Sequence, residues 1–282
     1  MRCLQFAVLA ATVFGVASTA TAADMTVKAP VSAPASVNNW TGWYAGLNAG
    51  GDWGTSNSSM SADPDVGGFF GGCQLFSCDV NIEDVARAGQ QRFRTSGFSG
   101  GVQGGYNWQS GNLLLGIETD FDYFRSTGSG TNSVPLVSGS PSRSIANIST
   151  STDWLFTLRP RIGLVQNNWL FYATGGLAVT ELRANWNWTE TAFGSTESAS
   201  AASTKAGWTV GGGLEWAFWN NWSAKLEYDF YDFGTRTLTF TGTFAGVPIE
   251  VPGVDIRQRI QTVKFGINYR FDWGKAPVVA RY

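Results

Sequence analysis

The chain has 282 residues, of which 43% are hydrophobic and 14% are charged, and its formal net charge is −2. This length suits one large domain, and neither the charge nor any run of Lys or Arg indicates a nucleic-acid partner. The chain contains no histidine, which excludes catalytic triads and metal sites that depend on imidazole. We therefore expect that the protein is not an enzyme and that it has neither a cofactor nor a metal site.

The N-terminus has the pattern of a secretory signal peptide. Arg2 precedes an apolar run from Phe6 to Ala17, and small residues follow as far as Ala23. This apolar run is too short to span a bilayer. We predict a signal peptide over residues 1–22, an Ala/Pro-rich linker over residues 23–39, and an exported protein.

Two cysteines, Cys73 and Cys78, lie beyond the predicted signal peptide. In an exported protein this spacing favours a local disulfide within a loop. Free thiols or a metal site remain the alternative, although two thiolates without any histidine make a poor zinc site.

Apolar and polar residues alternate with a period of two in eight segments, which predicts β-strands. The first covers residues 43–49 and is followed by a segment, 54–94, that we expect to be a loop. A strand over 98–108 and one over 113–123 follow, joined by a tight turn at residues 110–112. A second loop is expected over residues 126–150.

The next hairpin runs from residue 154 to 164 and returns from residue 169. Pro160 interrupts its first strand, and we expect a bulge there because proline cannot donate a ladder hydrogen bond. The returning strand is apolar on both faces, so its phase stays open. After an expected loop at 185–204, strands at 208–218 and from 222 flank Asn220-Asn221, which is typical of a hairpin turn. A loop over 235–255 then precedes the closing strand, 263–271.

The eight strands are connected alternately by tight turns and long segments. A transmembrane barrel places short turns on its periplasmic side and long loops outside, whereas a soluble β-sandwich has no reason to sort its loops. The pattern predicts an all-β fold, an eight-stranded antiparallel up-and-down transmembrane β-barrel over residues 40–271 with four long extracellular loops. Tryptophans near the tight turns are expected to form a periplasmic aromatic girdle: Trp108, Trp169, Trp216, Trp219 and Trp222.

The charged residues of the strands fall on the face opposite to the aromatic one, which would be the barrel interior. Buried charges are normally paired, so we interpret them as a salt-bridged plug. Glycoside hydrolysis by paired acids is the alternative for the carboxylates among them. The expected interior charge network comprises Glu118, Asp120, Arg159, Arg161, Glu215, Lys225, Glu227, Asp229, Lys264 and Arg270.

The segment GLEWAFWNNWSAKLEYDFYDFG, with YATGGLAV before it and VKFGINYRF after it, resembles the small outer-membrane β-barrel family of alphaproteobacteria. These proteins, often labelled porin family or outer-membrane surface antigens, are related to the transmembrane domain of OmpA. The resemblance covers about residues 40–271 and implies a location in the Gram-negative outer membrane. It also implies an assembly signal in the closing strand: Val263, Phe265, Ile267, Tyr269 and Phe271. Residues 272–282 depart from it, because they extend beyond the phenylalanine that should be terminal.

The expected partners are outer-membrane lipid, lipopolysaccharide and the barrel-assembly machinery. Eight strands leave an interior just wide enough for side chains. The leading hypothesis is therefore a non-enzymatic structural or surface-exposed protein of the outer membrane. A small-solute diffusion channel, loop-mediated adhesion or ligand binding, and a soluble secreted β-protein are the alternatives.

Overall fold

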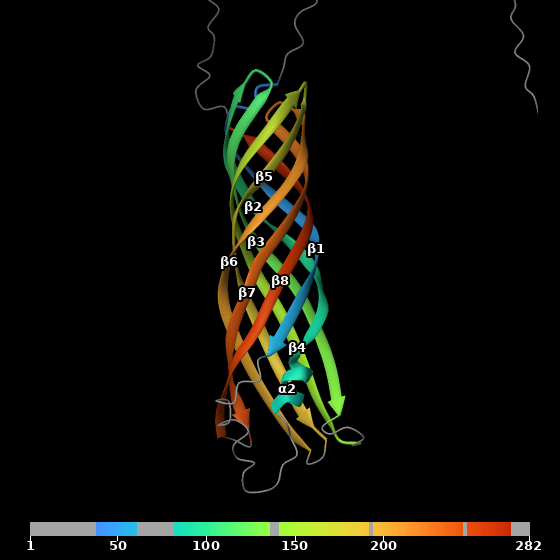
Figure 1. Ribbon diagram of the computed structural model, residues 1–282. Coiled ribbons are helices and arrows are strands. Elements are labelled where there is room, and N and C mark those ends of the chain that lie inside the picture. The colour runs from blue at the N-terminus through green and yellow to red at the C-terminus, as the bar shows by residue number, and fades with distance from the viewer. Residues whose placement is uncertain (1–37, 61–81, 136–140, 192–193, 245–246, 272–282) are drawn as a thin grey trace, which may run out of the picture. The chain divides into compact units, whose positions relative to one another are not determined.

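The computed structural model describes residues 38–60, 82–135, 141–191, 194–244 and 247–271. Eight antiparallel strands form one closed barrel, in which each strand pairs with its neighbours in sequence and β8 pairs with β1 (Figure 1). The predicted fold class is confirmed. The elements are β1 (Gly42–Met60), α2 (Ile82–Gly89), β2 (Gln91–Ser110), β3 (Leu113–Pro135), β4 (Arg143–Gln166), β5 (Trp169–Glu190), β6 (Ser195–Trp219), β7 (Trp222–Phe244) and β8 (Val247–Arg270).

We call the end of the barrel where β1 begins the proximal end and the opposite end the distal end. At the proximal end, two-residue turns connect β2 to β3, β4 to β5 and β6 to β7. Gly111, Asn167 and Asn220 open these turns with φ of 59°, 55° and 38°, a region that glycine and asparagine tolerate better than other residues. The second residue of each turn accepts a hydrogen bond from a strand outside its own hairpin. The donors are the amides of Val165, Ala217 and Arg270.

The proximal half of the barrel has an apolar outer face and a polar interior. On β3, Leu115 and Phe121 are 50% and 54% exposed, whereas Glu118 and Asp120 between them are 1% exposed. The outward apolar residues of this strand extend from Leu113 to Tyr123. This eleven-residue stretch, tilted as in other barrels, rises about 28 Å, the thickness of a hydrocarbon core. We call this zone the lipid band.

The strands are longer than the alternation of the lipid band predicts. They contain 19 to 25 residues, which corresponds to a rise of about 60 Å for the longer ones. The loops expected over 126–150, 185–204 and 235–255 are therefore wrong, because most of these residues continue the strands. The expected loop over 54–94 is strand at both ends, and α2 occupies residues 82–89.

Beyond the lipid band the two faces of the sheet exchange character. On β5, Leu182 and Trp186 are buried inside the barrel, while Arg183 and Asn185 between them face outward. Water replaces lipid outside this part of the wall, so apolar side chains gain by turning inward. They form a hydrophobic distal core inside the barrel: Met60, Ala88, Phe93, Ala146, Ile148, Leu182, Ala184, Trp186, Trp188, Ala199, Leu238, Val254 and Ile256.

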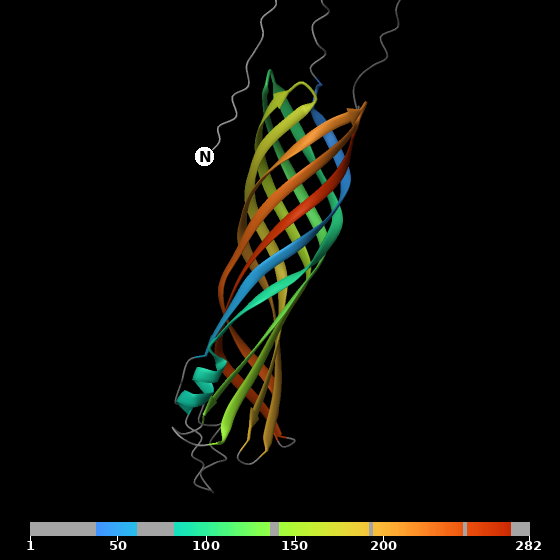
Figure 2. The same cartoon turned by 90° about the vertical axis from the view of Figure 1, so that its right-hand side faces the viewer.

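Helix α2 lies against β1, β3 and β4 at the distal end (Figure 2). Its last turn is attached to the barrel by Ser58, whose hydroxyl donates to the Gly89 carbonyl at 2.9 Å. Within the described residues no helix is long and apolar enough to cross a membrane.

Two local expectations concern the hairpin formed by β4 and β5. The bulge expected at Pro160 is wrong, since the register between β4 and β5 is the same at Leu158 and at Arg161. Pro160 instead faces outward in an unbroken register, and the β5 residues between Thr174 and Leu177 are glycines. The open phase of β5 is also settled: Trp169 faces outward and is 41% exposed, whereas the next residue, Leu170, is buried.

Candidate functional site: the ion-paired interior

Arg159 occupies the centre of the proximal interior and has no exposed surface. Its Nη2 atom lies 3.0 Å from Glu118 and 2.6 Å from Asp120, both on β3. The same guanidinium reaches across the barrel to β7, where it lies 2.9 Å from Glu227 and 2.5 Å from Asp229. One cation therefore connects carboxylates from two strands that are not adjacent in the sheet.

Arg161 points inward two residues further toward the proximal end. Its Nη1 atom lies 3.2 Å from Glu118 and 3.5 Å from Glu215, and its Nε donates to the Asn107 side chain at 2.9 Å. The guanidinium also lies 4.6 Å from the centre of the Tyr44 ring, within cation–π range. Arg161 thus has a partner on almost every side.

Two lysines complete the network. Lys225 lies 2.9 Å from Glu118 and 3.5 Å from Glu227. Lys264, on β8, lies 2.9 Å from Asp122. The structure therefore brings nine of the ten expected charged residues into the interior, and it adds Asp122, which the sequence places on the same face of β3.

Arg270 is the exception. It is partly exposed at the proximal end of β8, where its guanidinium donates to the Asn38 side chain at 3.1 Å and lies 5.8 Å from the Trp40 ring. Including Arg270 in the interior network was therefore wrong. The strand ends at this residue, so its side chain bonds to groups at the proximal rim of the barrel.

Two tyrosines belong to the network although the sequence did not single them out. The Tyr44 hydroxyl donates to Glu118 at 2.7 Å, and the Tyr172 hydroxyl donates to Glu227 at 2.5 Å. Each ring lies over a glycine of a neighbouring strand, because a Cβ atom on Gly105 or Gly213 would come within 3 Å of the ring. The glycine-rich strands therefore make room for aromatic side chains inside the barrel.

The carboxylates of this network are buried against their cationic partners. Glu118, Asp120, Glu227 and Asp229 are at most 1% exposed, and each bonds to an arginine. The described residues contain no group of three or more Asp, Glu or Cys arranged to hold a metal ion. This arrangement is suited to cross-linking strands and closing the interior, since the carboxylates already bond to protein cations that they share.

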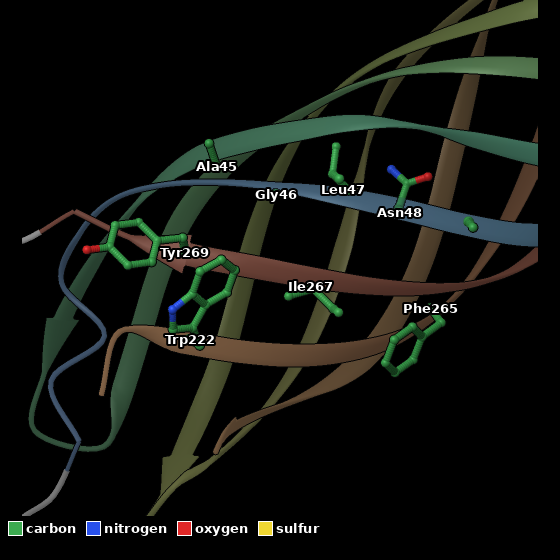
Figure 3. Close-up of a pocket in the computed structure, with 9 residues that line it drawn as sticks. Ala45, Gly46, Leu47, Asn48, Trp222, Phe265, Ile267 and Tyr269 are labelled. Carbon is green, nitrogen blue, oxygen red and sulfur yellow. The ribbon is translucent and has the colours of Figure 1, made fainter. Parts of the chain in front are cut away.

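A shallow apolar groove lies on the outside of the barrel, where β1 meets β8 (Figure 3). Trp222, Phe265, Ile267 and Tyr269 line one side of it, and Ala45 leaves space on the other. The groove is within the lipid band, so lipid chains are sufficient to fill it.

The expected girdle and assembly-signal residues lie on the outer surface. The five girdle tryptophans are 40% to 66% exposed and lie within four residues of a proximal turn. In the closing strand, Val263, Phe265, Ile267 and Tyr269 face outward, and the Phe271 amide donates to the Trp43 carbonyl at 2.8 Å. Their part in assembly stays a prediction.

Several expectations lie outside the described residues. These are the disulfide between Cys73 and Cys78, the signal peptide over residues 1–22, nearly all of the linker and the extension 272–282.

Comparison with protein families matches residues 6–271 to the outer membrane protein beta-barrel domain. The chain belongs to this family. A 31 kDa outer-membrane immunogenic protein of Brucella melitensis is 35% identical over 260 residues, which make up 90% of this chain and 95% of the relative. A 22 kDa outer membrane protein of Rhizobium leguminosarum is 29% identical over 178 residues, or 63% of this chain and 68% of the relative. This outer-membrane barrel is therefore located in the cell outer membrane, as predicted.

Among solved structures, this outer-membrane barrel is similar to the protease OmpT from Escherichia coli. The match has a TM-score of 0.43 and 8% identity, and it covers 82% of this chain and 97% of OmpT.

Proposed function

We propose that the protein is a closed, non-catalytic barrel that presents its distal end at the cell surface. The observation that carries this proposal is Arg159, which bonds to carboxylates of β3 and β7 across the interior. Toward the distal end, the hydrophobic distal core fills the interior of the barrel as well. The interior is thus filled at two levels, first by the ion pairs and then by the distal core. A structural or surface role fits such a filled interior best.

The turns of the barrel indicate its orientation. Membrane barrels have short turns on the periplasmic side, and the three two-residue turns of this chain all lie at the proximal end. The distal extension then projects outward from the cell. The names of the relatives from Brucella, which are outer-membrane immunogenic proteins, agree with a part that is exposed at the surface.

A small-solute channel is the second candidate, and a layer of unsatisfied polar groups favours it. Near the distal limit of the lipid band, the buried Asp52 carboxylate forms no well-aligned hydrogen bond with the described residues, although the Ser126 hydroxyl is close enough to interact with it. The hydroxyls of Ser56, Thr95 and Ser99 have no hydrogen-bond partner among the described residues. Such a layer is readily hydrated, but a solute that passed it would still have to displace Arg159 or the distal core.

Planar-bilayer recording separates the two candidates. We expect the full-length protein to give no sustained openings, with heat-modifiable gel mobility showing that the same preparation is folded. Replacing Arg159 by Gln leaves its carboxylates without their shared cation, and we expect brief, cation-selective openings in that variant. Arg183, which pairs with Asp153 and Glu181 on the outer surface, provides the control, because Arg183→Gln leaves the interior intact. Sustained wild-type openings that Arg159→Lys or Glu227→Gln alters would overturn the closed barrel.

A further inference from the structure

Four arginines surround the distal part of β1 on the outside of the barrel. In the sheet, Thr55 is paired with Arg94 of β2 on one side and with Arg259 of β8 on the other. Asn57 is flanked in the same way, by Arg92 and Arg257. We call these four residues the seam arginines: Arg92, Arg94, Arg257 and Arg259.

The seam arginines outnumber the acidic side chains that pair with them among the described residues. Asp232 lies 3.2 Å from Arg257 and 2.9 Å from Arg259. Arg92 and Arg94 are exposed and make no hydrogen bond or ion pair with any residue that the structure describes. Four guanidinium groups thus share one described carboxylate, and two of them are free to bind an anion.

The position of the seam arginines indicates the kind of anion. Trp53, two residues before Thr55, is 44% exposed and packs against Tyr228, with 6.4 Å between the ring centres. Aromatic residues of this kind mark the boundary between hydrocarbon and headgroups. The seam arginines begin one outward position beyond Trp53, at the depth where lipid phosphates lie.

We propose that the seam arginines bind the phosphate groups of lipid A, the membrane anchor of lipopolysaccharide. The guanidinium group presents donors in a fork that matches phosphate oxygens, and it binds phosphate more specifically than a point charge does. Neighbours across β1 are two strand spacings apart, about 10 Å, and residues along one strand are about 7 Å apart. The array is therefore large enough to contact more than one phosphate. This inference rests on the proposed orientation, in which the distal end faces the outer leaflet.

Arg92 and Arg94 allow a test that leaves the fold intact, because substituting them breaks no described ion pair. We would measure the affinity of the full-length protein in neutral detergent micelles for bisphosphorylated lipid A and for lipid A without phosphates. Each arginine near an anionic lipid surface contributes about fivefold in affinity, so R92Q/R94Q should bind bisphosphorylated lipid A about 25-fold more weakly. The wild type should lose a similar factor with dephosphorylated lipid A, and its affinity should fall as salt is added.

Arg183→Gln is the matched control, because Arg183 is an exposed outward arginine that already has two acidic partners. Its affinity for lipid A should stay close to that of the wild type. An equal loss in Arg183→Gln, or no loss in R92Q/R94Q, would overturn the site. Displacement of lipid A by excess inorganic phosphate would assign the site to free phosphate instead. Micelle binding is independent of orientation and of conductance, so failure of the closed barrel and failure of this site give different results.

Discussion

At the scale of single residues, the many ion pairs of the interior network add less to the stability of the barrel than their number suggests. The Coulomb attraction of a buried ion pair is largely offset by the cost of removing both charges from water. Removing one partner is nevertheless costly, because the other charge stays buried without compensation. Arg159 is the extreme case, since several carboxylates would lose their cation together. We therefore expect the network to contribute more to one specific arrangement of strands than to the free energy of unfolding.

Lys205 is a buried charge of a different kind. It lies inside the barrel on β6, distal to Trp208 and outside the lipid band, and its ammonium donates to the Ile256 carbonyl at 2.9 Å. Burial lowers the pKa of Lys205 to about 8, and the positive charge of Arg236 acts in the same direction.

The lowered pKa of Lys205 predicts a pH dependence of stability. Between pH 8 and the ordinary lysine pKa of about 10.4, the unfolded chain binds more protons than the folded barrel, so stability should rise with pH. The rise from this group is on the order of 2–3 kcal/mol. Urea unfolding of the protein in vesicles across this pH range would measure it. Lys205→Met should abolish most of the rise, and an unchanged rise in that variant would assign it to other groups.

At the scale of elements, several of the register shifts of the sheet lie where the lipid band ends. The register between β3 and β4 shifts between Tyr123 and Ser126, and that between β4 and β5 shifts between Thr152 and Leu155. The β7–β8 register shifts after Asp232. Bulges increase local twist and are common at barrel rims. Here they coincide with the change from an apolar outer face to an apolar interior.

The strands could be predicted from the sequence where one face contacts lipid, because there the two faces of a strand differ strongly in polarity. Tryptophan and leucine facing lipid and charges facing inward make the period of two visible, so Glu118 and Arg159 were placed correctly on the inner face. The network's actual pairings could not be predicted, because they depend on which strands lie opposite each other across the barrel. Arg270 was misplaced because alternation gives a face of the sheet and not a depth.

The distal strands were missed for a different physical reason. Their outward residues are Ser, Thr, Asn and Arg, as in a loop, and only their inward residues are apolar. The signal was present in LRANWNW, where Leu182, Ala184, Trp186 and Trp188 alternate with polar residues. In this segment the apolar residues face inward, as they do in a water-soluble sheet. A search for apolar residues that face outward therefore overlooks it.

Trp186 provides a test of the distal core. It is 2% exposed and among the largest fully buried side chains of the described structure. Trp186→Ala should remove about 3–5 kcal/mol, as truncation of a large buried aromatic usually does. The effect should be local, so we expect faster protease cleavage of the distal strands in vesicles with heat-modifiable mobility retained. Asn187→Ala, on the outer face of the same strand, should leave cleavage unchanged. Equal cleavage of both variants would contradict a packed distal core.

At the scale of the whole molecule, the barrel combines two types of protein. Its proximal half has the inverted polarity of a membrane barrel, with charges inside and aromatic residues outside. Its distal half has the polarity of a water-soluble sheet closed on itself, with an apolar interior. A single set of strands runs through both, and the boundary between them is marked by the exchange of side-chain polarity, with register shifts close to it.

This division predicts a strong dependence on depth for one type of substitution. Ile117 faces outward near the middle of the lipid band and is 41% exposed, whereas Thr127 faces outward on the same strand beyond it. Ile117→Arg should destabilise the barrel by about 2–4 kcal/mol, because a charge would face hydrocarbon. Thr127→Arg should cost less than about 1 kcal/mol. Urea titration of both variants in lipid vesicles would measure the difference, and equal costs would place the lipid band elsewhere.

The long distal wall also decides what an antibody or other macromolecule can recognise there. In that wall Thr55 stands between Arg94 and Arg259, residues that are far apart along the chain but adjacent in the sheet. A binding surface of this kind consists of side chains from several neighbouring strands, which the hydrogen bonds between the strands hold in place. Short peptides copied from one strand would lack the neighbouring columns of side chains. Antibodies raised against the folded barrel should therefore bind poorly to such peptides and lose binding when the protein is unfolded.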